Sequence, residues 1–99
     1  MLRLQPEYEV LSAFCRKWRV RELSLFGSAL RDDFGPQSDV DILVTFESGV
    51  RLELSDFLEM KEELETLYGR PVDLVEKETI RNPWRRYEIL KTRRVIYAA

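Results

Sequence analysis

Apolar residues recur along this chain with two periods, the three-to-four-residue period of a helix and the two-residue period of a strand. The helical period predicts three helices, over residues 7–18, 52–68 and 83–93. Asn82 and Pro83 are suitable N-cap and first residues for the last helix, and Gly69 is a suitable stop for the second. The apolar residues on one half of the second helix are Leu54, Phe57, Leu58, Leu64, Leu67 and Tyr68.

The strand period predicts three short strands, over residues 22–26, 40–46 and 72–75. Gly27-Ser28 is expected to turn the chain into a short helix through about Asp32, followed by a loop over residues 33–38. Residues 95–97 form an apolar tail that is placed to pack on the sheet. The order of elements favours one α/β (α+β) domain over residues 1–99, with helices covering a sheet of three to four strands.

Two residue types limit the chemistry of this chain, because it has no histidine and a single cysteine, Cys15. Histidine bases, Ser-His-Asp triads and zinc sites built from histidine or several cysteines are excluded, and Cys15 is expected in the core. Catalysis would depend on carboxylates, hydroxyls, basic side chains, backbone groups and a hard metal such as magnesium. No stretch approaches the ~18 apolar residues of a membrane span and no apolar signal core is present, so a cytoplasmic location is expected.

The net charge of −2 is unevenly distributed. Residues 53–65 carry six acids against one lysine, whereas residues 81–94 carry six bases against one glutamate. The simplest interpretation of the acidic run and of the basic run is that each lies on a helix face exposed to water. The basic run has a second interpretation, as a surface for a triphosphate, an RNA or an acidic partner protein.

Asp39 and Asp41 flank the start of the strand predicted for residues 40–46. Side chains two residues apart on a strand point the same way, so both carboxylates are expected on one face. The two like charges repel each other, and a divalent cation would remove that conflict through the oxygen ligands that magnesium prefers. The simpler alternative is a polar start to the strand that closes the preceding loop.

Gly27-Ser28 follows a predicted strand and opens a short helix. Glycine lets the backbone approach a ligand closely, and a helix N-terminus offers free N–H groups that suit phosphate. The Ser28 hydroxyl would add a donor, although a plain N-cap serine explains it as well. Arg31, three residues further on, is placed either to contact phosphates or to lie on the surface.

A third acid, Asp73, interrupts the apolar strand predicted for residues 72–75. A buried carboxylate is costly without a partner, and a metal held by Asp39 and Asp41 would be such a partner. The alternative is an edge strand with Asp73 facing water. A phosphate turn, paired acids and a third acid are together the parts that two-metal nucleotidyl transfer requires, with Asp73 as ligand and candidate base.

The pattern resembles the minimal nucleotidyltransferases (MNT domains) of the DNA polymerase β-like superfamily. Residues 25–31 and 38–44 match the family signature of Gly-Ser, ten residues and Asp-x-Asp, and residues 69–75 look like the strand of its third carboxylate. The likeness extends from Phe14 to Tyr97 and implies the nucleotidyltransferase fold, with a small mixed sheet.

By this resemblance, Asp39 and Asp41 would hold two magnesium ions and Asp73 would complete the site. Gly27 and Ser28 would bind the β- and γ-phosphates, and ATP is the implied substrate. The implied reaction transfers a nucleoside monophosphate, usually AMP, onto a hydroxyl and releases pyrophosphate.

The resemblance also implies a protein partner. A chain of 99 residues has no room for the acceptor-binding domain of larger relatives. MNT proteins are often paired with a small helical HEPN toxin, a ribonuclease, and add AMP to a tyrosine of that toxin. The expectation is therefore a protein adenylyltransferase of the MntA type, the antitoxin of a type VII-like pair, with neither a membrane nor a nucleic acid as partner.

Two alternatives remain open. A protein of the same fold could mask its partner without turnover, in which case the set of acids would not be needed. A transferase subunit could instead act on a nucleic acid or a small molecule, with the basic run at residues 81–94 contacting nucleic acid.

Overall fold

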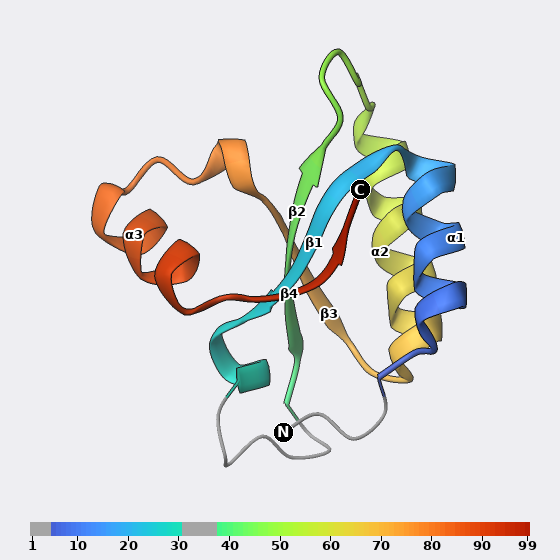
Figure 1. Cartoon of the computed structure of the whole chain (residues 1–99), viewed down its shortest axis with the longest axis horizontal. Helices are drawn as coiled ribbons and strands as arrows, with labels where there is room; N and C mark the ends of the chain where they lie inside the picture. The colour runs from blue at the N-terminus through green and yellow to red at the C-terminus, as the bar shows by residue number, and fades with distance from the viewer. Residues whose placement is uncertain (1–4, 31–37) are drawn as a thin grey trace.

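Figure 1 shows the chain in a computed structural model, which describes residues 5–30 and 38–99. In chain order the elements are α1 (Tyr8–Trp18), β1 (Val20–Phe26), the 3₁₀ turn η1 (Gly27–Leu30), β2 (Val40–Phe46), α2 (Leu54–Tyr68), β3 (Val72–Glu76), the 3₁₀ turn η2 (Lys77–Thr79), α3 (Pro83–Thr92) and β4 (Arg94–Ala98). Every helix and strand expected from the sequence is present. The predicted end of the short helix at Asp32 and the loop over residues 33–37 lie outside the described residues.

The four strands form one mixed sheet in the order β3-β2-β1-β4. β1 is antiparallel to both β2 and β4, whereas β2 and β3 are parallel. This confirms the predicted small mixed sheet covered by helices. The tail expected to pack on the sheet is a full edge strand, because its β-branched and aromatic residues pair with β1 between Glu22 and Leu25.

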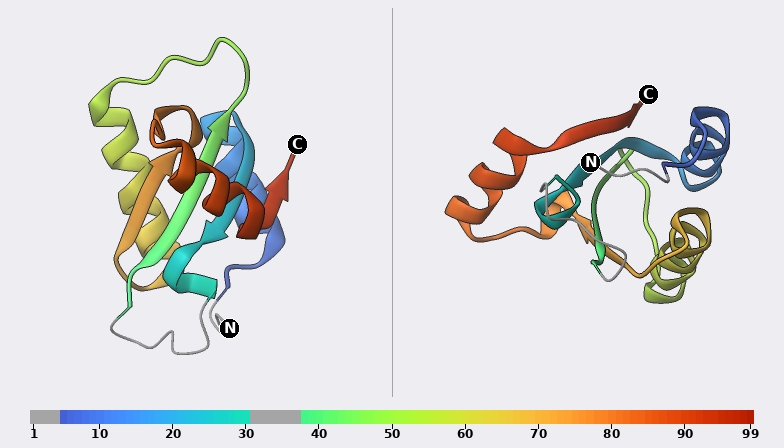
Figure 2. Two further views of the ribbon diagram at one scale, coloured as in Figure 1. Left: turned by 90° about the vertical axis from the view of Figure 1, so that its left-hand side faces the viewer. Right: turned by 90° about the horizontal axis from the view of Figure 1, so that it is seen from below.

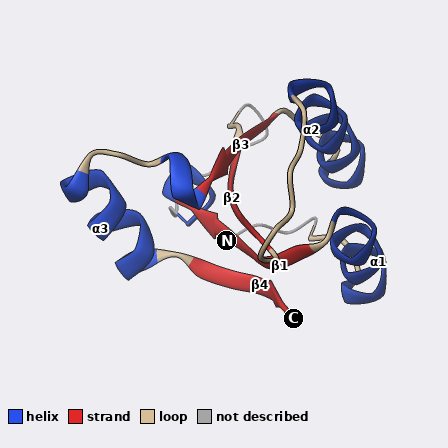
Figure 3. Cartoon of the chain, turned by 90° about the horizontal axis from the view of Figure 1, so that it is seen from above, coloured by secondary structure: helices blue, strands red, loops and turns tan. Residues whose placement is uncertain are grey.

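The helices lie on opposite faces of the sheet (Figures 1 and 2). α1 and α2 lie side by side on one face, and α3 lies on the other. The main core lies under α1 and α2 and includes Leu11, Cys15, Leu23, Ile42, Val44, Met60 and Leu64. A smaller cluster of Phe26, Leu43, Ile80 and Ile89 lies under α3. Figure 3 shows the same arrangement from above, with α3 on the opposite side of the sheet from α1 and α2.

Local signals fix the helix ends. Asn82 Oδ1 accepts hydrogen bonds from the backbone N–H groups of Trp84 (2.9 Å) and Arg85 (3.1 Å), which confirms it as the N-cap of α3. Gly69 ends α2 in the left-handed conformation, as predicted. α2 begins two residues later than predicted, because Glu53 forms a capping box with Asp56.

The predicted core face of α2 is partly wrong. Leu54 and Leu58 are 74% and 49% exposed, whereas Met60, Leu64 and Tyr68 are buried. Leu58 precedes Met60 by two residues, which turns it about 160° away around the helix. The side of α2 that packs on the sheet is therefore the one that carries Met60, Leu64 and Tyr68, which are spaced four residues apart.

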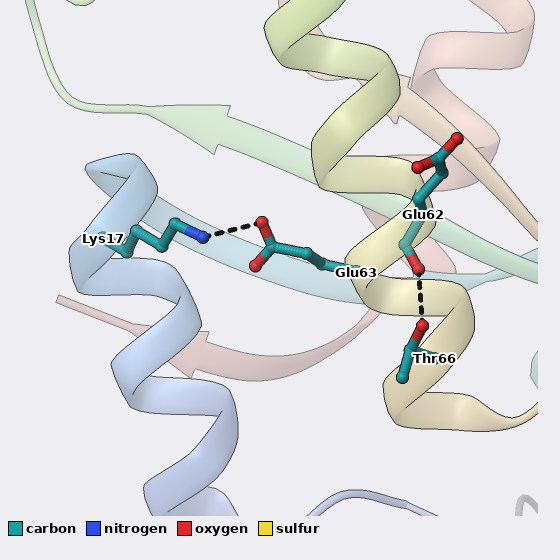
Figure 4. A network of polar contacts seen from close by, with 4 residues as sticks. All are labelled: Lys17, Glu62, Glu63 and Thr66. Carbon is teal, nitrogen blue, oxygen red and sulfur yellow. Dashed lines mark hydrogen bonds and ion pairs between the residues drawn. The ribbon is translucent and has the colours of Figure 1, made fainter.

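α1 and α2 are also joined by a surface ion pair, shown in Figure 4. Lys17 Nζ of α1 lies 2.8 Å from Glu63 Oε2 of α2. Beside it, Thr66 Oγ1 donates a hydrogen bond to the Glu62 carbonyl within α2. Exposed pairs of this kind contribute on the order of 0–1 kcal/mol, so the two helices are held mainly by their buried side chains. None of the helices in the described part of the chain has the length and apolar content that crossing a membrane requires.

Cys15 is fully buried, which confirms it as a core residue. Burial raises the pKa of its thiol from 9.0 to about 12, against a smaller opposing effect of Arg16. Burial likewise raises the pKa of Tyr68 to about 12, although its hydroxyl donates a 3.2 Å hydrogen bond to Gln5 Oε1. Both groups are therefore protonated in the folded protein at neutral pH.

We expect the free energy of unfolding to fall as the pH rises above 9. The unfolded chain ionises Cys15 near its ordinary pKa of 9.0, whereas the folded chain keeps the thiol protonated until about 12, so alkaline solution favours unfolding. The contribution of this group to stability is fully present below 9 and is lost progressively up to about 12. Urea titrations across this pH range measure the effect.

The matched variant is Cys15→Ala, which removes the titrating group. It should be less stable than the wild type at neutral pH because it leaves a cavity, but its stability should vary less with alkaline pH. An identical pH dependence in both proteins would contradict the assignment to Cys15.

Candidate active site

Asp41 and Asp73 are direct partners on the parallel strands β2 and β3. Neighbouring strands lie about 4.8 Å apart, and paired residues point to the same face of the sheet. Leu43 and Val75, each two residues further along, pack in the cluster under α3. Both carboxylates therefore stand on the α3 face, beyond the end of that cluster.

Asp39 and Asp73 are both exposed. Asp39 lies immediately before β2, which begins at Val40. Asp73 lies on β3, an edge strand, so the expectation that it needs a partner because it is buried is wrong. The structure instead matches the alternative in which Asp73 faces water, and no buried charge has to be compensated.

Ser28 contacts the carboxylate of Asp41 through two donors. Its backbone N–H lies 3.0 Å from Asp41 Oδ2 and its hydroxyl oxygen lies 2.9 Å from the same atom. The hydroxyl is also 3.0 Å from the carbonyl oxygen of Asp39. A hydroxyl has one proton, so the Asp41 carboxylate and the Asp39 carbonyl compete for it.

The absence of a side chain at Gly27 allows this contact. A Cβ at that position would lie 2.5 Å from Asp41 Oδ2, and the backbone φ of +58° is one that residues with a side chain rarely adopt. Gly27 is therefore required by the approach of Asp41 to the turn. The fixed number of residues between Gly27 and Asp41 in the sequence pattern is consistent with this contact. The sequence alone did not identify Asp41 as the residue that contacts the turn.

The donor atoms of these acids suit magnesium. All are carboxylate oxygens, and Asp41 and Asp73 stand on adjacent strands on one face. Within residues 5–30 and 38–99, however, no three acidic or cysteine side chains converge closely enough to hold a metal ion. Since Asp39 and Asp73 are exposed, their side chains can rotate towards Asp41 without disturbing the core. The three acids therefore suit magnesium in two respects: their donor atoms are carboxylate oxygens, and two of them lie side by side on adjacent strands.

Two of the three residues predicted to contact phosphate lie within the described part of the chain. Gly27 and Ser28 directly follow β1, as predicted, and the Ser28 hydroxyl contacts Asp41. Arg31, the remaining candidate for phosphate binding, lies outside the described residues. Sequence reasoning assigned the Ser28 donors to phosphate and missed their contact with Asp41, because that contact depends on how β1 and β2 pair.

Known proteins that resemble this chain share its domain. The family model of the nucleotidyltransferase domain matches residues 7–97. The protein adenylyltransferase MntA of Thermococcus cleftensis is 41% identical over 86 residues, which cover 83% of this chain and 85% of the relative.

Solved structures share the fold. A toxin–antitoxin structure with AMP-PNP has a TM-score of 0.73 at 18% identity, covering 94% of this chain and 74% of that one. A tri-AMPylated HEPN toxin in complex with an MNT antitoxin, from Shewanella oneidensis, gives a TM-score of 0.65 at 18% identity, covering 100% of this chain and 74% of that one.

The match to the family model extends over nearly all the helices and strands described above, and the relative from Thermococcus aligns over most of its own length. The chain therefore belongs to the nucleotidyltransferase domain family and is a nucleotidyltransferase.

Proposed function

We propose that this enzyme transfers AMP from ATP to a tyrosine hydroxyl of a HEPN toxin, with magnesium ions at the acids, and so acts as an antitoxin. The observation that carries the proposal is the placement of Asp41 beside Asp73 on parallel strands, with the Gly27-Ser28 turn in contact with Asp41. Support comes from the relative named as a protein adenylyltransferase and from the complex in which an AMPylated HEPN toxin is bound to an MNT antitoxin.

Asp39, Asp41 and Asp73 are the residues that would hold magnesium. When bound, the ions supply charge stabilisation at the triphosphate and lower the pKa of the attacking hydroxyl. Asp41 is the best positioned of the three, because Ser28 fixes its carboxylate through two donors. Asp39 and Asp73 flank it, one just before β2 and the other on the outer strand.

Ser28 links the acids to the proposed phosphate site. Its N–H and hydroxyl are the donors proposed for the phosphates, and in the structure both contact Asp41. Phosphate oxygens would therefore compete with Asp41 for these donors, and the charge of a cation held by the acids would offset the repulsion between the two anions. The absence of a side chain at Gly27 is what allows the Asp41 carboxylate to lie this close to the Ser28 donors.

In the proposed reaction ATP is divided into an AMP group, which is transferred to the acceptor, and pyrophosphate, which is released. The acceptor oxygen forms a bond to the α-phosphorus while the bond from that phosphorus to the bridging oxygen breaks, and pyrophosphate leaves. The hydroxyl proton is transferred to a base, for which Asp73 is proposed. An exposed carboxylate on an edge strand is accessible to an acceptor that arrives from solution.

We expect the double variant Asp39→Asn/Asp41→Asn to lose transfer of AMP by about a hundredfold or more. Amides are weaker ligands for magnesium than carboxylates, and metal stabilisation of the transition state is worth several kcal/mol. The measurement is the transfer of α-labelled ATP, with magnesium, to the protein encoded by the neighbouring gene. Glu59→Gln/Glu62→Gln on α2 is the matched control, since it removes the same charge from exposed positions far from the turn.

Two results would contradict the proposal. If the double variant still silences the partner while the wild type adds no label, the protein masks its partner without turnover. If the wild type labels RNA in the absence of any protein partner, the acceptor is a nucleic acid.

A second prediction concerns the close approach at Gly27. Gly27→Ala should abolish most of the transfer, because the new Cβ displaces the Asp41 carboxylate that lies 2.5 Å from its position. It should also lower the free energy of unfolding by about 1–2 kcal/mol through strain at positive φ. Activity and urea unfolding, measured on the same preparation, separate the two effects.

Gly49→Ala and Gly69→Ala are the controls for backbone strain alone. Both glycines have positive φ, and no atom of the described residues lies within 4 Å of the Cβ built at either. They should lose similar stability and keep their transfer activity. Wild-type activity in Gly27→Ala would show that the close approach of Asp41 is not required.

A further inference from the structure

We propose that the outward face of α3 is the docking surface for the protein that accepts AMP, and that this partner presents an acidic patch around an apolar centre. The docking face is defined here by Trp84, Arg85, Tyr87 and Lys91 of α3, together with Arg81, which lies just before the helix. The inference rests on the proposed function for the identity of the partner, whereas the surface itself is argued from the exposure, charge and position of these residues.

Two aromatic side chains of α3 are open to solvent. Trp84 is 80% exposed and Tyr87 is 58% exposed. Together with Lys91 they occupy positions i, i+3 and i+7 of the helix, so they form one stripe, and Lys91 Nζ lies 5.5 Å from the centre of the Tyr87 ring. Tryptophan, tyrosine and arginine are the residues most enriched at energetic centres of protein interfaces.

The fold does not require these aromatic side chains. α3 packs on the sheet through Ile89 and Leu90. Arg86 Nη1 donates a 2.8 Å hydrogen bond to the carbonyl of Lys77, which fixes the first half of the helix. The outward stripe is therefore held in place by contacts on the opposite side of the helix.

The end of α3 is fixed by a separate ion pair. Arg93 Nε lies 3.1 Å from Glu22 Oε2 of β1, and both side chains are about three-quarters buried. Arg93 also donates a 2.6 Å hydrogen bond to the Leu90 carbonyl. Partly buried pairs with such geometry hold an element more firmly than exposed ones, so α3 presents its outer face as a fixed surface.

The charge of the docking face indicates an acidic partner. Arg81, Arg85 and Lys91 are exposed and form no ion pair among the described residues. Their local positive charge contrasts with the net charge of −2 for the whole chain. Complementary charges across an interface steer association and select the partner.

A protein suits this face better than an RNA. Glu88 lies between Trp84 and Lys91 on the same side of the helix and is exposed. A carboxylate in the middle of the face would repel a phosphate backbone, whereas a protein surface can place a basic or neutral residue opposite it. A single helix with exposed aromatic anchors also matches the helix-in-groove mode of protein recognition.

The docking face lies on the side of the sheet that carries the acids. Ile89, on the inner side of α3, packs in one cluster with Leu43 of β2. Leu43 follows Asp41 by two residues, a separation of about 7 Å along the strand. α3 stands out from this face of the sheet, opposite α1 and α2 (Figures 1 and 3). A partner that extends from the docking face onto this side of the sheet would reach the acids and could present a tyrosine to them.

The test is direct binding of the full chain, without nucleotide, to the protein encoded by the neighbouring gene. Trp84→Ala and the double reversal Arg81→Glu/Arg85→Glu should each raise the Kd by about tenfold or more. Binding by the wild type should weaken as salt is added, and the charge reversal should remove most of that dependence. Circular dichroism confirms that each variant is folded.

Matched controls alter exposed residues away from α3. Leu58→Ala removes an exposed apolar side chain from α2, and Arg51→Glu reverses an exposed charge before that helix. Both should bind as the wild type does. With labelled ATP, the α3 variants should raise the KM for the protein acceptor and leave kcat near the wild-type value.

The outcomes separate this inference from the proposed function. Weaker binding by the α3 variants, with no AMP transfer by the wild type, would support the docking face and refute the transferase proposal. Equal binding by the wild type and the α3 variants, or no binding by the wild type, would overturn the docking face. It would also be overturned if the variants bind the protein normally but lose binding to a single-stranded oligoribonucleotide.

Discussion

The parallel pairing of β2 with β3 is the constraint on which the proposed site depends. Parallel neighbours cannot be joined by a tight turn, and here α2 is the crossover between them. α2 must therefore pack firmly on the sheet, which it does through Met60, Leu64 and Tyr68. If α2 did not pack on the sheet, β3 would not be held beside β2, and Asp73 would no longer lie beside Asp41. The helix thus supports the two acids from the opposite face of the sheet.

A second constraint is the close contact of the Gly27-Ser28 turn with Asp41. The antiparallel pairing of β1 and β2 places Phe26 opposite Asp41, so the turn that follows Phe26 passes directly by that carboxylate. Gly27 gives the space and Ser28 gives the donors. The pairing of β2 with β1 on one side and with β3 on the other therefore determines which groups surround Asp41. Neither pairing buries its carboxylate in the core.

The elements and the Gly-Ser and Asp-x-Asp pattern were predictable because they depend on local periodicity and spacing. The sequence left the exposure of Asp73 open between two alternatives, since it depends on β3 being an edge strand, and strand order is set by packing between distant segments. The exposure of Leu54 and Leu58 was missed for a similar reason, because apolar spacing gives a broad helical stripe and the sheet contacts only part of it. The Ser28–Asp41 contact likewise required the tertiary register.

The two faces of the sheet carry different parts of this small protein. The face under α1 and α2 holds the large buried core, whereas the α3 face has a small cluster and the acids beyond it. The buried apolar side chains are thereby concentrated away from the acids, so the acids can stay in water, and the core does not include the aromatic residues on the outside of α3. A chain of 99 residues that buried Trp84 would gain a larger core. Its 80% exposure instead leaves the indole ring available for the docking proposed above.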